Sequence, residues 1–406
     1  MGDWQLVKAE EFINFNPRES VPKGMMAKKV AMEQLQPFTR DLPSYEVSPF
    51  NGGSKFRNGD TLMARITPCL ENGKTALVDI LEDGEVGFGS TEFIVLRAKP
   101  GVSDRNFIYY LAISPILRDK AIKSMVGSSG RQRVQQGVMN DIKFFAPPLS
   151  EQIEIGRTLR ALDDKIATNA KINHHLEQMA QAIFKSWFLD FEPWGGVIPS
   201  DWREVQLADV CDVKGGKRLP KGENLTTTPN SHPYIRVRDM NNALYVQMND
   251  AIEYVNDEIQ HSISRYIVAA DDIIVSIVGT IGMVCKVHPS MNNANLTENC
   301  VKLTNLHEVT SDFLYLFLSS PDGQEAIRRG TVGAVQAKLP IKNIQAITIM
   351  CPPANVMTDF DCFVSQAMLM IANNCTENQR LATLRDTLLP RLMSGELSVA
   401  NLESAK

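Results

Sequence analysis

The chain repeats itself once, at a distance of about 200 residues. Short words from the first half return in the second half, in the same order and 198 to 206 residues later. They are Asp3-Trp4 with Asp201-Trp202, Pro22-Lys23-Gly24 with Pro220-Lys221-Gly222, Thr91-Glu92 with Thr297-Glu298, and Pro147-Pro148 with Pro352-Pro353. Solenoid repeats are only about 20–50 residues long. The sequence therefore predicts a duplicated domain with its connector, and a function exercised at two places.

Composition restricts the class of protein. With 406 residues the chain is long enough for two or more domains, and 44% hydrophobic with 22% charged residues is typical of a soluble globular protein. The longest apolar stretch, residues 273–285, is too short to span a bilayer, and the N-terminus lacks the pattern of a signal peptide. Seven cysteines without a CxxC pair or zinc-site spacing fit reduced thiols. We expect a cytoplasmic protein without a metal ion, a cofactor or a membrane contact.

The net charge of −5 hides a basic segment. Residues 97–143 contain nine basic residues and only three acidic ones. A nucleic-acid-binding protein requires a local basic surface more than a basic total. A solvated surface without further function would have the same composition, so charge alone leaves both interpretations open.

Residues 149–191 and 354–395 are predicted to form two long helices. Each follows a Pro-Pro pair, which is excluded from a helix interior but can precede a helix. Apolar residues then recur at steps of three and four, and the two copies share this heptad seam at an offset of 205. The seam positions are Ile155, Leu159, Leu162, Ile166, Leu176 and Ile183 in the first copy and Phe360, Val364, Ala367, Ile371, Leu381 and Leu388 in the second. We therefore expect the helices to pair as a coiled coil.

Two asparagines interrupt the seam in each copy. Asn169 and Asn173, near the middle of the first helix, correspond to Asn374 and Asn378 in the second. Polar residues in such a seam reduce stability but fix register and orientation. If the helices pair antiparallel about a pseudo-two-fold axis, Asn169 lies opposite Asn378 and Asn173 lies opposite Asn374. The alternative is that these asparagines are exposed and that the helices pack elsewhere.

The length of the helices suggests a second role for them. About forty helical residues at about 1.5 Å each form a rod of about 60 Å, whereas one turn of B-DNA measures about 34–36 Å. Two domains held at opposite ends of such a rod could contact DNA sites more than one turn apart.

Residues 1–148 and 194–353 are predicted to be two mixed α/β domains of an α+β protein, with connectors at 149–193 and 354–406. Short β-prone runs alternate with Gly, Asn and Asp turns, and helical patterns follow. The predicted strands are at 61–66, 92–96, 272–278 and 300–303, and the predicted helices at 105–124 and 311–328. The copies differ most at 25–90 and 223–296. Two domains that share a framework but differ in one surface suggest two different targets. Loops that diverged without a change of function would give the same pattern.

A glycine-rich loop with glutamines and basic residues occurs at equivalent positions of both domains, residues 127–136 and 330–338. Glycine lets a backbone approach a phosphate, Arg and Lys neutralise the phosphate, and Arg or Gln can pair with base edges. We predict that these loops and other basic residues contact DNA: Arg65, Lys74, Arg131, Gln132, Arg133, Gln136, Lys217, Arg218, Lys221, Arg236, Arg238, Gln336 and Lys338. Taken singly, each is better explained as a solvated surface residue. The recurrence of the loop is what favours binding.

The motifs of several enzyme classes are missing from the sequence. It contains no Walker-type loop, no GxGxxG fingerprint, no GxSxG elbow and no HExxH zinc motif. It also lacks the Asn-Pro-Pro-aromatic tetrapeptide with which an amino-methyltransferase grips a flipped base, because its Pro-Pro pairs follow Ala146 and Cys351. Together these absences favour a non-catalytic binding protein.

Several longer segments resemble one protein family. Residues 146–156, Ala-Pro-Pro-Leu-Ser-Glu-Gln-Ile-Glu-Ile-Gly, and the helix end Ile-Phe-Lys-Ser-Trp-Phe at 183–188 resemble the first central conserved region of the specificity subunits of type I restriction–modification systems, the HsdS family. Residues 388–397, Leu-Leu-Pro-Arg-Leu-Met-Ser-Gly-Glu-Leu, resemble the end of the second. Residues 62–74 and 87–93 resemble motifs inside the target recognition domains of that family.

The resemblance covers the whole chain in order, and it implies a DNA-binding subunit without catalytic activity. Such a subunit places two target recognition domains on the two halves of a bipartite sequence in double-stranded DNA. Its helices recruit two modification subunits, which carry the methyltransferase chemistry, and restriction subunits join to translocate and cleave DNA. The second connector departs from the family's Pro-x-x-x-Gln pattern, because Met357 stands where the first copy has Gln152. The resemblance therefore assigns no shared role to that glutamine.

Two other functions stay open at the level of the sequence. A protein–protein scaffold could use the duplicated domains to hold two copies of one partner without sequence-specific DNA contact. A self-contained fusion of methyltransferase and specificity subunit is disfavoured by the length of the chain and by the missing motifs. Salt-dependent DNA binding separates the DNA-binding protein from the scaffold, since phosphate contacts weaken steeply with salt.

Overall fold

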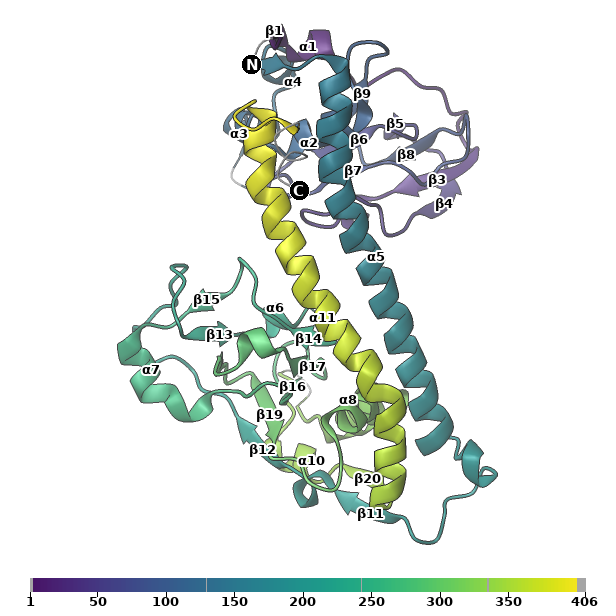
Figure 1. The fold of residues 1–406 in the computed structure, drawn as a ribbon, viewed down its shortest axis with the longest axis vertical. Coiled ribbons are helices and arrows are strands. Elements are labelled where there is room, and N and C mark those ends of the chain that lie inside the picture. The colour runs from purple at the N-terminus through teal and green to yellow at the C-terminus, as the bar shows by residue number, and fades with distance from the viewer. Residues whose placement is uncertain (1–2, 129, 242, 334–335, 400–406) are drawn as a thin grey trace. The chain divides into compact units, whose positions relative to one another are not determined.

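The structure, a computed structural model, describes residues 3–128, 130–241, 243–333 and 336–399 (Figure 1). The chain forms two compact units, the first made of residues 1–168 with 380–406 and the second of residues 169–379. Each unit contains one α+β domain and one half of each of two long helices. These helices are α5 (Leu149–Phe188) and α11 (Ala354–Met393). The first unit is therefore assembled from two separate parts of the chain.

The domain of the first unit contains two four-stranded sheets. One sheet is antiparallel throughout, in the order β2-β9-β6-β7. The other has the order β4-β3-β8-β5, with β3 and β8 parallel. A separate antiparallel pair joins β1 to β10, the strand that leads into α5. The strands are β1 (Gln5–Lys8), β2 (Ile13–Phe15), β3 (Met26–Val30), β4 (Glu46–Pro49), β5 (Ser54–Phe56), β6 (Thr61–Ala64), β7 (Thr75–Leu77), β8 (Gly87–Gly89), β9 (Phe93–Ala98) and β10 (Lys143–Ala146).

The second unit repeats this plan with altered details. Its sheets have the orders β12-β19-β16-β17-β14 and β15-β13-β18, and β13 with β18 is again a parallel pair. The pair of β11 with β20 corresponds to that of β1 with β10. The strands are β11 (Arg203–Gln206), β12 (Asp212–Gly215), β13 (Pro233–Ile235), β14 (Tyr245–Val246), β15 (Glu253–Tyr254), β16 (Ile273–Ser276), β17 (Val284–Val287), β18 (Asn295–Leu296), β19 (Cys300–Thr304) and β20 (Thr348–Cys351). The predicted α+β fold class is confirmed.

Two helical stretches predicted as continuous are each broken in two. The first forms α2 and α3, and the second forms α8 and α9. The prediction is wrong because Pro115 and Pro321 follow the first helix of each stretch, and proline restricts the preceding residue and lacks an N–H. The helices other than α5 and α11 are α1 (Ala9–Phe12), α2 (Arg105–Ile113), α3 (Arg118–Lys123), α4 (Gln136–Asn140), α6 (Val237–Met240), α7 (Asp257–Ile263), α8 (Ser311–Ser319), α9 (Pro321–Gly330) and α10 (Ile341–Gln345).

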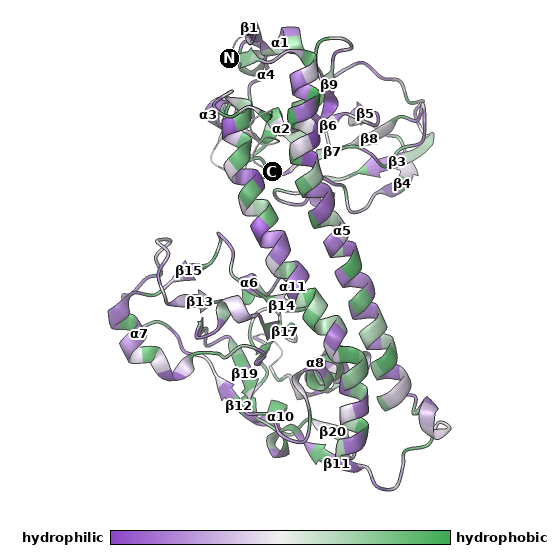
Figure 2. Cartoon of the chain, in the orientation of Figure 1, coloured by the Kyte–Doolittle hydropathy of each residue, from purple (hydrophilic) through white to green (hydrophobic). Residues whose placement is uncertain are grey.

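Helices α2 and α8 are central to the hydrophobic cores of the two domains. Six consecutive residues of each, 107–112 and 313–318, are buried, so both helices are enclosed on all sides. Figure 2 shows α8 as a largely hydrophobic helix. At the N-termini, the side chains of Asp104 and Thr310 accept hydrogen bonds from backbone N–H groups of the first turn. These caps satisfy donors that have no partner within the helix.

Within the second unit, α5 and α11 run antiparallel and meet through asparagines. Asn169 Nδ2 donates to Asn378 Oδ1 at 2.9 Å, and Asn374 Nδ2 donates to Asn173 Oδ1 at 2.8 Å. These are the two pairs that the repeat predicted. All twelve predicted seam residues are buried or half-buried. The expected antiparallel coiled coil is therefore confirmed.

Within the first unit, a buried ion pair joins the two long helices. Arg385 Nη1 donates to Asp163 Oδ1 at 2.7 Å, and the hydroxyl of Tyr110 in α2 donates to Asp163 Oδ2 at 2.6 Å. The side chains of Asp163 and Arg385 are only 6% and 8% exposed. Burial raises the pKa of Tyr110, and the charge of Asp163 raises this pKa further, so the phenol remains a donor. One carboxylate thus connects α2, α5 and α11.

We predict that Asp163→Asn destabilises the first unit by about 2–4 kcal/mol, because the guanidinium of Arg385 then loses its buried counter-charge and keeps only the exposed carboxylate of Asp386. Urea denaturation combined with hydrogen exchange of the α2 amides measures this loss. Glu154→Gln on the same helix is the matched control, since its exposed pair with Arg157 is worth at most about 1 kcal/mol. Replacing all three groups, Asp163→Leu with Arg385→Met and Tyr110→Phe, should recover much of the stability, because no buried polar group is then left without its partner. An Asp163→Asn protein as stable as the parent would contradict this account.

Candidate DNA interface

The glycine-rich loop of the first domain is a hairpin fixed to the end of β6. Arg133 and Val126 exchange two backbone hydrogen bonds of 2.9 and 3.1 Å. The next residue, Val134, donates its N–H to the carbonyl of Arg65 at 2.8 Å. The loop therefore begins and ends beside the last residues of a core strand, which gives its basic side chains a rigid base.

The loop of the second domain has the same frame. Lys338 and Val332 exchange two backbone hydrogen bonds of 2.9 Å each, and Leu339 donates to the carbonyl of Ile277 at 3.0 Å. Ile277 follows β16, the strand that corresponds to β6. Lys338 therefore occupies the position that Arg133 has in the first domain.

A glycine near the base of each loop has a backbone conformation that other residues rarely adopt. Gly127 has φ of +141° and Gly333 has φ of +98°, and a Cβ atom at these positions would lie 2.8 and 2.7 Å from a carbonyl oxygen of the same loop. The tight turn thus depends on glycine. Ser129, Ala334 and Val335 of the predicted loops lie outside the described residues.

In the first domain, the basic side chain of the loop meets a glutamate. Arg133 Nε lies 3.0 Å from both carboxylate oxygens of Glu92, and its Nη2 donates to Oε1 at 2.7 Å. Arg65 Nε lies 3.9 Å from the same carboxylate. The hydrogen bonds from Arg133 hold the pKa of Glu92 below its usual range, although partial burial opposes this shift. Glu92 belongs to the repeated Thr-Glu word and directly precedes β9.

The remaining residues of the two predicted loops differ in accessibility. Arg131, Gln336 and Lys338 are exposed, whereas Gln132 and Gln136 are half-buried. The side-chain oxygen of Gln136 accepts a hydrogen bond from Asn16 Nδ2 at 2.8 Å.

In the second domain, the segment after β12 contains three of the predicted residues. Arg218 Nε donates to Glu298 Oε1 at 2.6 Å, and Lys217 Nζ lies 5.6 Å from the centroid of the Tyr266 ring. Lys221 is exposed. Burial would raise the pKa of Glu298, but the hydrogen bond from Arg218 and the backbone outweighs burial and lowers it. The Thr-Glu word of the second copy is therefore paired with an arginine as well.

Lys74, Arg236 and Arg238 also have partners inside their own domain. Lys74 Nζ donates to a backbone carbonyl at 2.9 Å. Arg236 donates to Glu253 and lies 3.0 Å from the buried carboxylate of Asp239, and Arg238 lies 3.4 Å from Glu253. Lys74 and Arg236 are half-buried. Because internal acceptors hold them, these two side chains have a structural role that basic composition alone did not reveal.

A cavity near the first loop contains two basic residues that the sequence analysis missed. Arg18, after β2, and Lys55, on β5, line a cavity of about 410 Å³ together with Arg65. Arg18 follows β2 as Arg218 follows β12, so alignment of the two copies would have pointed to it. Lys55 had a weaker signal, the Gly-Gly-Ser run that precedes it.

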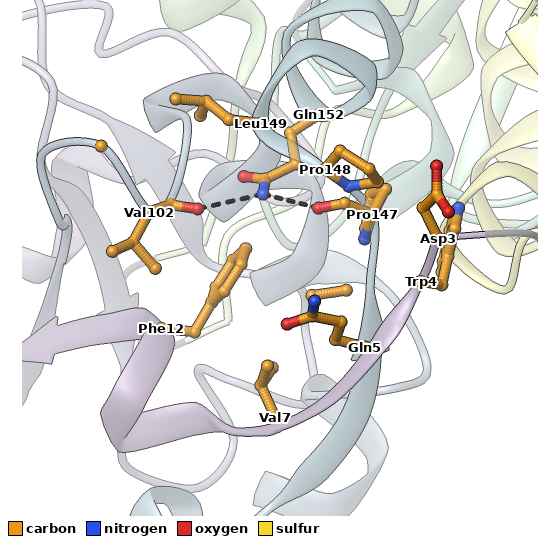
Figure 3. Close-up of a pocket in the computed structure, with 12 residues that line it drawn as sticks. Asp3, Trp4, Gln5, Val7, Phe12, Val102, Pro147, Pro148, Leu149 and Gln152 are labelled. Carbon is orange, nitrogen blue, oxygen red and sulfur yellow. Dashed lines mark hydrogen bonds between the residues drawn. The ribbon is translucent and has the colours of Figure 1, made fainter.

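Gln152 stabilises the junction between the first domain and α5 (Figure 3). Its Nε2 donates to the carbonyls of Val102 at 3.0 Å and Pro147 at 2.9 Å, as the dashed lines in Figure 3 mark. Its Oε1 accepts from the Asp104 N–H at 3.0 Å. The residue is 1% exposed. Three backbone groups at the start of α2 and α5 therefore depend on one buried amide. In the second copy, Met357 is buried in the apolar core instead.

Comparison with known proteins identifies the family. The family described as type I restriction modification DNA specificity domain matches twice, over residues 2–178 and 199–374. The two matches cover most of the sequence and follow the internal repeat. The chain therefore belongs to the type I restriction–modification DNA specificity family.

Individual relatives agree with this assignment. The specificity subunit of the type I restriction enzyme HindI from Haemophilus influenzae is 25% identical over 419 residues, which cover 86% of this chain and 89% of the relative. The specificity subunit of the enzyme MjaIX from Methanocaldococcus jannaschii is 24% identical over 313 residues, 73% of this chain and 70% of the relative. A crystal structure of the type I S subunit from M. genitalium matches 96% of each chain with a TM-score of 0.55 at 17% identity, which shows a shared fold.

The protein is thus a DNA sequence-specificity subunit, a non-catalytic component of a type I restriction–modification system. Its partners are DNA and other components of such a complex. The predicted family and function are confirmed. In the described part of the chain, no helix has the length and hydrophobicity needed to cross a membrane, and no cluster of three metal-ligating side chains is present among the same residues.

We predict that Gln152→Met destabilises the first domain by about 1–3 kcal/mol, because three backbone groups lose their partner and one of them, the carbonyl of Pro147, is at a buried position. The loss is measured as a fall in the urea midpoint and as faster hydrogen exchange at the Asp104 amide. Gln181→Met, at an exposed position of the same helix, is the control and should have little effect. Unchanged stability of Gln152→Met would mean that the junction is held by other contacts.

Proposed function

We propose that residues 1–148 and 194–353 are two target recognition domains, each reading one half of a bipartite sequence in double-stranded DNA. The main support for this proposal is the glycine-rich loop. It is fixed to an equivalent strand end in both domains, whereas its side chains differ between the two domains. Arg133 in one copy and Lys338 in the other have equivalent backbone positions. A common frame with different polar groups is what two unlike half-sites would require.

We also propose that residues 149–193 and 354–406 act as the spacer and assembly region. Residues 400–406 of this connector lie outside the described part of the chain. The hydrogen bonds of Asn169 with Asn378 and of Asn173 with Asn374 support a role in fixing helix register. On this proposal two modification subunits bind the helices, restriction subunits join them, and the complex acts on DNA in the cytoplasm.

Exposed apolar residues on both helices support the recruitment of partners. On α5, Ile172 and Met179 are 37% and 59% exposed, and on α11, Phe363 and Met370 are 61% and 50% exposed. The members of each pair are seven residues apart and therefore lie on one face of their helix. Apolar side chains gathered on one exposed face favour an interaction surface over scattered solvent contacts.

We predict that the logarithm of the specific DNA-binding constant of this chain, measured with its cognate modification subunits, falls linearly with the logarithm of the salt concentration. The reason is that phosphate contacts release counterions. Methylome sequencing of a host that expresses the complex gives both half-sites and the spacer. Replacing residues 1–148 with the corresponding domain of a relative should then change one half-site only. A change in both half-sites would contradict the division into domains. Absence of DNA affinity even with modification subunits would favour the protein scaffold instead.

We predict that Met179→Glu with Met370→Glu weakens binding of the modification subunits by about 10-fold or more, because charges replace apolar contacts at an interface. Pull-down and analytical ultracentrifugation measure this effect. Thermal stability should change little, since both side chains are exposed. Val47→Glu, which replaces a similarly exposed residue of the first domain, is the control. Normal assembly of the double variant would exclude this helix face as the docking surface.

A further inference from the structure

The repeated Thr-Glu word holds an arginine in both domains, although the two arginines come from different segments. Glu92 binds Arg133 of the glycine-rich loop, and Glu298 binds Arg218 of the segment after β12. We infer that Glu92 and Glu298 are positioning residues, each of which orients one DNA-contacting arginine. This inference rests on the proposed function, because it assigns roles within the proposed DNA interface.

The two glutamates lie in corresponding turns of the fold, each before an inner strand of its sheet. Glu92 directly precedes β9, whereas one residue separates Glu298 from β19, and offsets of 206 relate both the word and the helices that follow. In the first domain Arg65 N–H donates to the carbonyl of Glu92 at 2.9 Å, and in the second Ile277 N–H donates to the carbonyl of Asn299 at 2.8 Å. Both turns are thus tied to the strand end that also carries the glycine-rich loop.

The exposure of these ion pairs argues against a purely stabilising role. The Arg133 side chain is 47% exposed and the Arg218 side chain is 78% exposed. Ion pairs at such exposure contribute only about 0–1 kcal/mol to stability. By contrast, the pair of Arg97 with Asp60 in the first domain has a carboxylate that is 1% exposed, as expected for a structural contact. Recurrence of a weak pair at the same place in both copies therefore points to a function other than folding.

The geometry at Glu92 leaves donors of Arg133 available. The carboxylate accepts from Nε and Nη2, so the two N–H groups of Nη1 and one of Nη2 have no bond to this glutamate. This outer edge of a guanidinium matches the O6 and N7 atoms of guanine. Holding the inner edge removes rotamer freedom before DNA arrives, which reduces the entropy lost on binding.

The different origins of the two arginines also bear on specificity. Arg133 is part of a hairpin whose base is fixed by backbone hydrogen bonds, whereas Arg218 follows an outer strand of its sheet. The glutamate of the repeated Thr-Glu word thus orients an arginine from a different segment in each domain. We expect each arginine to contribute discrimination at one position of its own half-site.

The test uses the full chain with its cognate modification subunits and a duplex that carries the target found by methylome sequencing. Glu92→Gln should weaken specific binding by about 5- to 100-fold, the range of one bidentate base contact. The salt slope should stay unchanged because no phosphate contact is removed. Discrimination should relax only in the half-site read by the first domain. Glu33→Gln, an exposed residue of the same domain, is the charge-matched control.

Arg133→Ala and the double variant with Glu92→Gln separate the outcomes. If Glu92 acts through Arg133, the double variant binds no more weakly than Arg133→Ala alone. If Arg133→Ala has no effect on DNA binding, the proposed interface at this loop is wrong. If Arg133→Ala weakens binding but Glu92→Gln does not, or Glu92→Gln strengthens binding to every sequence alike, only the positioning inference is overturned. Glu298→Gln with Arg218→Ala repeats the test independently in the second domain.

Discussion

The whole structure depends on the way in which two long helices are shared between the cores of two domains. In the first unit, Leu159 of α5 and Leu392 of α11 belong to one hydrophobic cluster, and in the second unit Phe184 and Phe360 do the same. These partners are far apart in the sequence, so each core closes only when the C-terminal helix is in place. Hydrophobic burial is the main favourable term in folding, and the connectors are therefore structural parts of both domains rather than passive linkers.

The ion pairs of this protein form a buried group and an exposed group, which differ in their contribution to stability. The buried pair of Asp163 with Arg385 joins the two long helices, and the buried pair of Lys286 with Asp312 joins β17 to α8 inside the second domain. Burial raises the pKa of Asp312 while the neighbouring ammonium of Lys286 opposes the shift, so the pair depends on close contact. The exposed pairs at Glu92 and Glu298 contribute little to stability. The arginine side chains of these pairs remain accessible, which is the condition for contact with a ligand.

Features that depend on spacing along the chain were predictable from the sequence. The asparagine pairs followed from the offset of 205 and the heptad seam, because register in a helix pair is set by linear position. The breaks at Pro115 and Pro321 also have a local sign in the sequence, because proline disfavours the helical conformation at the residue before it and lacks an N–H. Lys74 could not be assigned in this way, since its acceptor, the carbonyl of Met32, is 42 residues away in the sequence. Arg236 had a local sign in Asp239, three residues later, but its second acceptor, Glu253, is 17 residues away.

The sequence by itself determined the duplication, the two long antiparallel helices and the class of the two domains, because these follow from composition, period and order along the chain. Only the tertiary structure decided which polar side chains have internal partners and which stay accessible. Arg133 meets Glu92 across 41 residues, and Gln152 meets Val102 across 50. Such contacts depend on how strands and loops are brought together in space, and hydrogen bonds and ion pairs between distant segments leave no periodic trace in the sequence.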